Sequence, residues 1–211
     1  ENTQNRCSGM VMTTAETTAV CEVAHEAGVA VHLDGARIFN AAVALEVPVM
    51  ELTRDVDDAS FCLSKSLSCP VGSVLVGSKD FISEARRWRK MVGGGMRQAG
   101  ILAAAGLVAL DTMVDRLAED HQNARRLAAG LANIDGLSLD ADSIQTNIVI
   151  FDVDEKVAKV PDFMKALVDA EVLVSYPGEH SVRMVTHRHI SGDDVEEALS
   201  RTSKVVRELQ G

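Results

Sequence analysis

Aromatic residues are scarce in this chain of 211 residues: phenylalanine, tyrosine and tryptophan together make up 3%, with a single tryptophan and a single tyrosine. Such a chain offers few rings on which nucleic-acid bases could stack. Basic residues are also outnumbered by acidic ones, 21 to 31, which gives a formal net charge of −10. An acidic chain repels phosphate backbones. The composition therefore argues against nucleic acid as a partner.

Long hydrophobic runs are absent as well. The longest apolar stretch, Ile101 to Leu110, has about ten residues, whereas a membrane-spanning helix needs ~18. We therefore expect a buried helix there and no membrane partner. The polar opening, Glu1 to Arg6, lacks the basic start and apolar run of a secretory leader. It is typical of a loop entered from upstream sequence, so we expect a fragment of a longer protein.

Cysteine is infrequent and unpatterned. The four cysteines stand at positions 7, 21, 62 and 69, and no C-x-x-C pair occurs among them. Zinc ribbons and redox motifs depend on such pairs. We expect reduced thiols in a cytoplasmic protein.

The composition is otherwise that of an ordinary globular protein, with 46% hydrophobic and 25% charged residues. In the N-terminal part, short β-branched runs alternate with helical patterns, which predicts an α/β fold with a mostly parallel sheet. After Gly136 the order of elements favours a separate α+β domain. We expect helices over 13–26, 79–91, 99–132, 161–170 and 191–209, and strands over 29–33, 59–63, 73–76, 146–153, 172–175 and 182–186.

Two polar motifs directly follow predicted buried strands. Asp34 follows the strand over 29–33, and Lys65 follows the strand over 59–63. Taken alone, Asp34 is readily explained as a helix cap and Lys65 as a surface lysine. If both strands belong to one parallel sheet, however, the two side chains converge at its carboxyl edge, where ligands bind in open α/β sheets.

A lysine and a carboxylate at one sheet edge suit pyridoxal phosphate. The lysine amine can form a Schiff base with the aldehyde of this cofactor. The carboxylate can keep the pyridine nitrogen protonated, so that the ring accepts the electron pair released when a bond at the substrate's Cα breaks. The pair Lys65 and Asp34 therefore indicates an amino-acid substrate.

Two further segments are candidates for anion binding. Four of the five residues at 86–90 are basic, and Gly93-Gly94-Gly95 and Arg97 follow them; a solvated helix face is the alternative. The strand over 182–186 places Arg183 on the face opposite Val182 and Met184, from which it could bind a carboxylate across a domain cleft. The pair His187 and His189 suggests metal binding, but the sequence places no third ligand near it, so we expect no metal site.

In this order the motifs resemble the low-specificity L-threonine aldolases, which belong to the aromatic-amino-acid β-eliminating lyase/threonine aldolase group of fold-type-I pyridoxal-phosphate enzymes. The resemblance covers nearly the whole chain. The motifs that carry it are Glu1-Asn2-Thr3, His32 to Asn40, Leu63 to Leu67, Pro70 to Ser73, Arg87 to Met91, Gly93 to Gln98 and Val182 to His187.

The resemblance implies a role for each matched residue. Lys65 would be the Schiff-base lysine, with Ser64 beside it at the cofactor, and Asp34 would be the partner of the pyridine nitrogen. Arg37 would contact the cofactor ring hydroxyl or the substrate carboxylate. Three further residues would complete the substrate site: Arg183 at the carboxylate, with Lys90 and Arg97 lining the pocket.

The implied reaction is retro-aldol cleavage of L-threonine or L-allo-threonine to glycine and acetaldehyde. The family builds active sites shared between neighbouring subunits, so a homo-oligomer, dimer or tetramer, is expected. Residues 1–120 would be the C-terminal portion of the large cofactor-binding domain with the start of the linking helix, and residues 121–211 the small α+β domain.

Two departures from the family pattern matter. This chain has Gln4 where the family commonly has histidine, and the loop from Arg6 to Thr14 is longer than in bacterial relatives. In the family, the glycine-rich phosphate loop and the histidine that stacks on the cofactor lie upstream of the equivalent of Glu1. Two other hypotheses stay open: another fold-type-I enzyme, such as an aminotransferase or β-eliminating lyase, and a non-catalytic fragment that serves oligomerisation.

Overall fold

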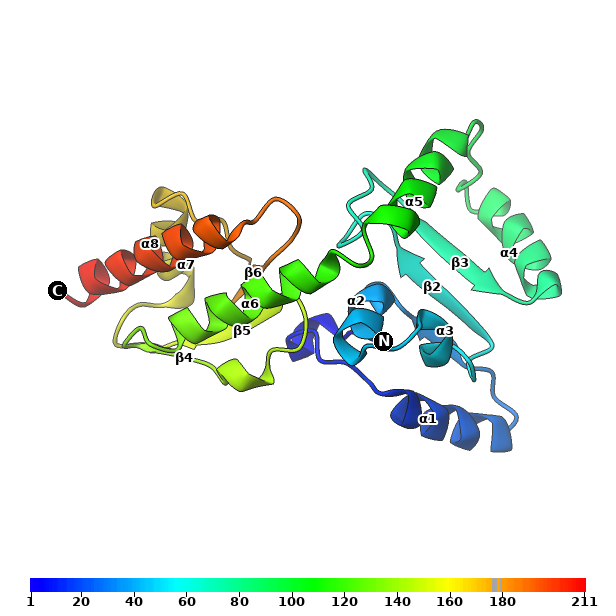
Figure 1. Cartoon of the computed structure of the whole chain (residues 1–211), viewed down its shortest axis with the longest axis horizontal. Coiled ribbons are helices and arrows are strands. Elements are labelled where there is room, and N and C mark those ends of the chain that lie inside the picture. The colour runs from blue at the N-terminus through cyan, green and yellow to red at the C-terminus, as the bar shows by residue number, and fades with distance from the viewer. Residues whose placement is uncertain (176–177, 179) are drawn as a thin grey trace. The chain divides into compact units, whose positions relative to one another are not determined.

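The computed structural model describes residues 1–175, 178 and 180–211, which form two compact units (Figure 1). The first unit contains residues 1–3 and 11–117, and the second contains residues 4–10 and 118–211. In the described part of the chain, no helix is long and apolar enough to span a membrane.

The first unit contains a three-stranded mixed sheet in the order β1-β2-β3. Strands β1 (His32–Asp34) and β2 (Asp58–Cys62) are parallel, whereas β2 and β3 (Ser73–Gly77) are antiparallel. The prediction of a mostly parallel sheet was therefore wrong for β3. The connection over 63–72 contains no helix, and it is shorter than the dozen or so residues that a parallel crossover needs.

The helices of the first unit include one whose start is fixed by capping residues. Helix α1 (Thr14–Glu26) begins with a capping box, in which Glu16 N donates to Thr13 Oγ1 and Thr13 N donates to Glu16 Oε2. The prediction for this helix was confirmed, and so was that for α4 (Lys79–Met91). The remaining helices are α2 (Ile38–Leu45), α3 (Val49–Leu52) and α5 (Gly100–Thr112).

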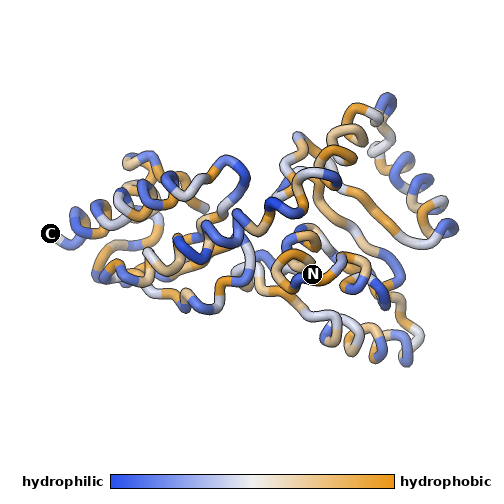
Figure 2. The backbone as a smooth tube through the Cα atoms, in the orientation of Figure 1, coloured by the Kyte–Doolittle hydropathy of each residue, from blue (hydrophilic) through white to orange (hydrophobic). Residues whose placement is uncertain are grey.

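Two small hydrophobic clusters hold this unit together. One lies between the sheet and α2 and α3, and includes Leu33 and Leu52. The other lies under α5 and joins Leu63 and Leu67 to Ala109. Strand β3 is hydrophobic in sequence (Figure 2) but largely exposed in the structure.

The long helix expected over 99–132 is broken into α5 and α6 (Leu117–Leu131). Met113 N donates to Ala109 O at the end of α5, and Leu117 N donates to Val114 O in a tight turn before α6. Val114 is β-branched and Asp115 prefers turns and caps, so both weaken a continuous helix. The alanine-rich composition on either side concealed this break.

The second unit contains an antiparallel sheet in the order β4-β5-β6, formed by Leu137–Ser138, Ile148–Val153 and Ser181–Val185. Its core is built with α6, α7 (Val160–Asp169) and α8 (Gly192–Gln210), and the rings of Phe151 and Phe163 meet edge to face at 6.4 Å. The strand expected over 172–175 is absent, since only Ser175 forms an isolated bridge, to Arg183.

A buried histidine in α6 makes the free energy of unfolding of the second unit depend on pH. His121 is 2% exposed, and burial, together with the nearby charge of Arg125, lowers its pKa from 6.5 to about 4. Below pH 6.5 the unfolded chain therefore binds a proton that the folded chain does not. The free energy of unfolding falls as the pH drops from 6.5 towards 4.

We expect this histidine to cost the wild-type protein about 2 kcal/mol of stability between pH 7 and pH 5. Urea unfolding at both pH values measures the effect, with His121→Gln as the variant that lacks the titrating group. The variant should lose about 2 kcal/mol less than the wild type over the same interval. Equal losses in the two proteins would show that His121 titrates normally.

Candidate active site

The segment after β1 remains hydrogen-bonded to β2 as it leaves the sheet. Gly35 N donates to Ser60 O at 2.8 Å, and Cys62 N donates to Ala36 O at 3.4 Å. A Cβ atom on Gly35 would lie 2.9 Å from Ser60 O, so a residue with a side chain would push the two segments apart. The glycine thus allows the residues that follow β1 to lie along the end of β2.

Asp34 is the last residue of β1, and its exposed carboxylate is fixed by a local hydrogen bond. Its Oδ1 accepts from Ala36 N at 3.0 Å, and its backbone oxygen accepts from Asn2 N at 3.0 Å. One carboxylate oxygen is thereby oriented by the chain. Arg37 follows at the start of α2 and is half-buried.

Lys65 lies in a loop after β2 whose shape is set by backbone hydrogen bonds. Leu63 N donates to Gly72 O at 2.9 Å, Cys69 N donates to Leu63 O at 3.0 Å, and the Lys65 carbonyl accepts from Ser68 N at 2.9 Å. Ser64 and Lys65 are exposed, whereas the flanking Leu63 is buried. Within the residues that the structure describes, the Lys65 ammonium makes no hydrogen bond or ion pair.

The structure brings the motifs of Asp34 and Lys65 to one edge of the sheet. Strands β1 and β2 are parallel neighbours: Asp34 is the last residue of β1 and lies opposite Ser60, and Lys65 lies in the loop that follows the end of β2 at Cys62. Helix α2, which follows Asp34, packs on β2 through Phe39 and Phe61, whose rings meet edge to face with their centroids 5.3 Å apart. A carboxylate and an amine are therefore presented from the same edge.

Lys90 and Arg97 lie elsewhere in the first unit. Lys90 is in the last turn of α4, with its stem beside Gly95, and Arg97 is in the turn before α5; both are exposed. Across the described residues, no hydrogen bond or ion pair links either of them to Asp34 or Lys65.

Arg183 lies in β6 of the second unit. The predicted alternation was confirmed, because Val182 and Met184 are buried and Arg183 is half-buried on the opposite face. Its Nε donates to Ser175 Oγ at 2.9 Å, and one Nη donates to Asn5 Oδ1 at 2.6 Å. Sequence reasoning missed both of these partners, because neither belongs to a motif that signals a contact with Arg183.

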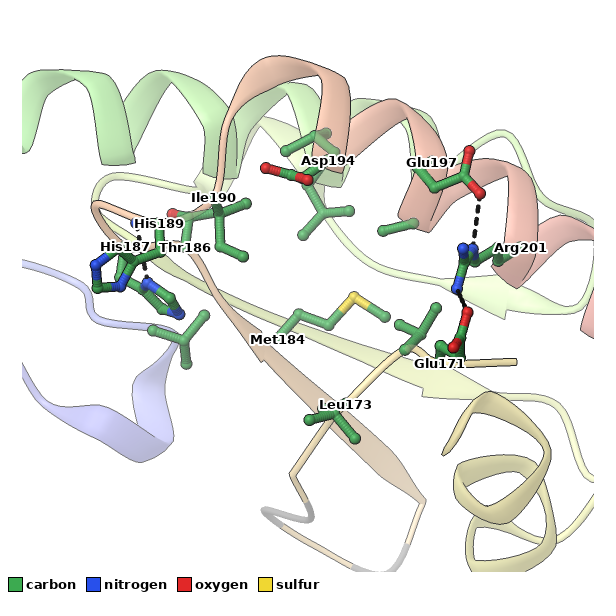
Figure 3. A pocket seen from close by; sticks show the side chains of 15 residues that line it. Glu171, Leu173, Met184, Thr186, His187, His189, Ile190, Asp194, Glu197 and Arg201 are labelled. Atoms are coloured by element: carbon green, nitrogen blue, oxygen red, sulfur yellow. Dashed lines mark hydrogen bonds and ion pairs between the residues drawn. The ribbon is translucent and has the colours of Figure 1, made fainter. Parts of the chain in front are cut away.

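The other face of β6 lines a pocket of about 450 Å3 (Figure 3). Met184 lies at its floor, and Arg201 is held between Glu171 and Glu197, with distances of 2.8 Å to each carboxylate. His187 and His189 also line it, with their rings 5.7 Å apart. None of the residues predicted for the site lines this pocket.

Comparison with known proteins identifies the family. Residues 1–155 match the family described as beta-eliminating lyase. The chain belongs to this family. This beta-eliminating lyase homologue is 46% identical to "Probable low-specificity L-threonine aldolase 2" of Arabidopsis thaliana over 97% of its own length, and 44% identical to the low specificity L-threonine aldolase of Escherichia coli O157:H7 over 95%.

The chain spans 58% of the Arabidopsis relative and 57% of the Escherichia coli relative. Among solved structures, a protein from Exiguobacterium sp. 255-15 assigned as an aromatic amino acid beta-eliminating lyase/threonine aldolase superimposes with a TM-score of 0.80 at 17% identity. The superposition covers 97% of this chain and 60% of that structure. The fold is therefore that of an α/β enzyme of this group.

Membership in this family implies pyridoxal phosphate, and the side chains at the sheet edge fit that cofactor. Its aldehyde needs an accessible amine, and its pyridinium nitrogen needs a carboxylate. Lys65 offers an exposed ammonium with no partner within the described residues, and Asp34 offers a carboxylate oriented by Ala36 N. The donor set therefore suits the reactive side of the cofactor.

Proposed function

We propose that this chain carries the reacting residues of a pyridoxal-phosphate-dependent carbon–carbon lyase that cleaves L-threonine or L-allo-threonine to glycine and acetaldehyde. The observation that carries the proposal is the presentation of Lys65 and Asp34 from one edge of the β1–β2 pair. The 46% and 44% identities to threonine aldolases support this substrate class.

Lys65 and Asp34 have distinct tasks in this proposal. The Lys65 amine holds the cofactor through its aldehyde and is then placed to take up or deliver a proton beside it. The Asp34 carboxylate keeps a proton on the pyridine nitrogen, because a nearby negative charge favours the protonated form. When bound, the cofactor supplies a ring that accepts the electron pair released as Cα–Cβ breaks.

The remaining predicted residues bind and orient in this proposal. Ser64, beside Lys65, contacts the cofactor, and Arg37 contacts its ring hydroxyl or the substrate carboxylate. Arg183 binds the substrate carboxylate, for which a guanidinium offers two parallel hydrogen bonds. Lys90 and Arg97 would line the site of a neighbouring subunit in a homo-oligomer, a dimer or a tetramer.

Product analysis tests the proposal directly. The protein, loaded with pyridoxal phosphate, is incubated with L-threonine, and the products are separated by chromatography. We expect glycine and acetaldehyde in equal amounts, and no 2-keto acid. A keto acid instead of the aldehyde would assign the chain to a different reaction of the same cofactor, such as transamination or β-elimination. The absence of any product would contradict a lyase.

A further inference from the structure

The two side-chain hydrogen bonds of the Arg183 guanidinium go to neutral groups. Its Nε donates to the hydroxyl of Ser175 at 2.9 Å, and one Nη donates to the side-chain oxygen of Asn5 at 2.6 Å. Across the part of the chain that the structure describes, no carboxylate pairs with this half-buried guanidinium. A partly desolvated positive charge without a counter-charge attracts an anion from solution.

Arg201, in the same unit, shows the opposite arrangement (Figure 3). Its guanidinium donates to the carboxylates of Glu171 and Glu197 and to the carbonyl oxygen of Ala170. Its charge is therefore neutralised by the chain itself. The contrast shows that the unit has acidic residues available for pairing with arginine but places neutral acceptors beside Arg183.

The two neutral contacts leave one edge of the Arg183 guanidinium available. A guanidinium has five N–H donors, of which Ser175 and Asn5 take one on Nε and one on an Nη. The remaining donors lie on the two Nη atoms, the edge that binds a carboxylate with two hydrogen bonds. We propose that Asn5 and Ser175 are positioning residues that hold Arg183 for the carboxylate of an amino-acid ligand. That the ligand is an amino acid rests on the proposed function.

Both positioning residues are themselves fixed. Ser175 exchanges two backbone hydrogen bonds with Arg183, and its hydroxyl hydrogen donates to the Arg183 carbonyl at 3.3 Å, which turns the oxygen towards Nε as an acceptor. Asn5 begins a short turn whose backbone is capped by the side chain of Gln4. The same segment is anchored at Gly9, whose carbonyl accepts from buried Thr146.

Three variants separate positioning from a merely structural role. Asn5→Ala removes the acceptor, Asn5→Asp keeps an acceptor but adds a negative charge beside Arg183, and Asn133→Ala is the matched control at an exposed position in the turn after α6. We expect Asn5→Ala to raise KM for L-threonine about tenfold, the effect of one hydrogen bond to a charged group, with little change in kcat.

Asn5→Asp should raise KM more than Asn5→Ala, because the new carboxylate pairs with the Arg183 guanidinium and neutralises the positive charge that would bind the ligand's carboxylate. A structural role predicts the reverse order, since aspartate preserves the hydrogen bond. Asn133→Ala should leave KM unchanged. Ser175→Ala should raise KM in the same direction as Asn5→Ala, and L-threoninamide, which lacks the carboxylate, should show none of these differences. Equal KM values in the wild type, Asn5→Ala and Asn5→Asp would overturn the proposal.

A second measurement does not depend on turnover. In the chain labelled with 15N-arginine, titration with sodium acetate should shift the Arg183 Nε resonance in the wild type and in Asn133→Ala, and shift it much less in Asn5→Asp. If this pattern is seen but threonine is not cleaved, the proposal that Arg183 binds a carboxylate stands and the proposed aldolase function is refuted. Threonine cleavage with an acetate-insensitive Arg183 would reject the anion site and retain the aldolase.

Discussion

Replacing Lys65 with alanine is expected to abolish cleavage of L-threonine while leaving the fold intact. The side chain is exposed, and the Lys65 contact that shapes the loop is made by its backbone carbonyl, which alanine retains. The substitution removes both the attachment of the cofactor and a proton-transfer group, and proton transfer alone accounts for ~10²–10⁴ in rate. Steady-state kinetics and circular dichroism measure the two effects.

Lys79→Ala is the control for this experiment, because Lys79 is an exposed lysine at the start of α4, outside the proposed site. Borohydride treatment of the loaded protein, followed by peptide mass mapping, adds a structural readout. A single pyridoxyl adduct should fall on Lys65 in the wild type and in Lys79→Ala, and no adduct should form in Lys65→Ala. Turnover by Lys65→Ala would refute the central assignment.

Replacing Asp34 with asparagine is the second change with a large expected effect. Asparagine keeps an oxygen that accepts from Ala36 N, so the segment after β1 keeps its shape while the negative charge is lost. Without that charge the pyridine nitrogen loses its proton, and we expect kcat to fall ~10²–10³-fold, as when one fixed electrostatic partner of a transition state is removed.

The rate of Asp34→Asn is measured together with the absorbance of the bound cofactor, which shows whether binding is retained. Asp111→Asn, on the exposed surface of α5, is the matched control and should behave as the wild type. An unchanged kcat in Asp34→Asn would mean that the carboxylate does not touch the cofactor ring. Loss of binding with normal turnover of the remaining loaded fraction would mean that Asp34 acts only in affinity.

Local signals in the sequence predicted those elements whose ends are set by neighbouring residues. The helices predicted over 13–26 and 191–209 form as α1 and α8, and in the structure capping boxes at Thr13 and Ser191 fix their starts, because the groups that satisfy the first backbone N–H donors are three residues apart. The strand predicted over 172–175 failed because a hydrophobic run does not show whether a partner strand is available to pair with it. Only Ser175 found one.

Local sequence could not predict the direction in which β3 pairs or how much of it is buried, because both depend on segments outside the strand. The apolar run over 73–76 predicts a strand, and β3 forms there. Its antiparallel pairing depends on the length of the connection over 63–72, and its exposure depends on what packs on it, which composition does not encode. In the site, the residues Asp34 and Lys65 stand out because charged groups follow apolar strands. Asn5 and Ser175 are ordinary polar residues, and their contact with Arg183 depends on folding of distant segments.

The loop that carries Lys65 has a consequence for protein engineering. Its path is specified by main-chain hydrogen bonds and by the buried side chains of Leu63 and Leu67, whereas Pro70 and Val71 are exposed and make no side-chain hydrogen bond. Libraries that randomise these two exposed positions therefore alter the surroundings of the loop without displacing the amine. Directed evolution of this scaffold can start there, with the anchoring leucines left untouched.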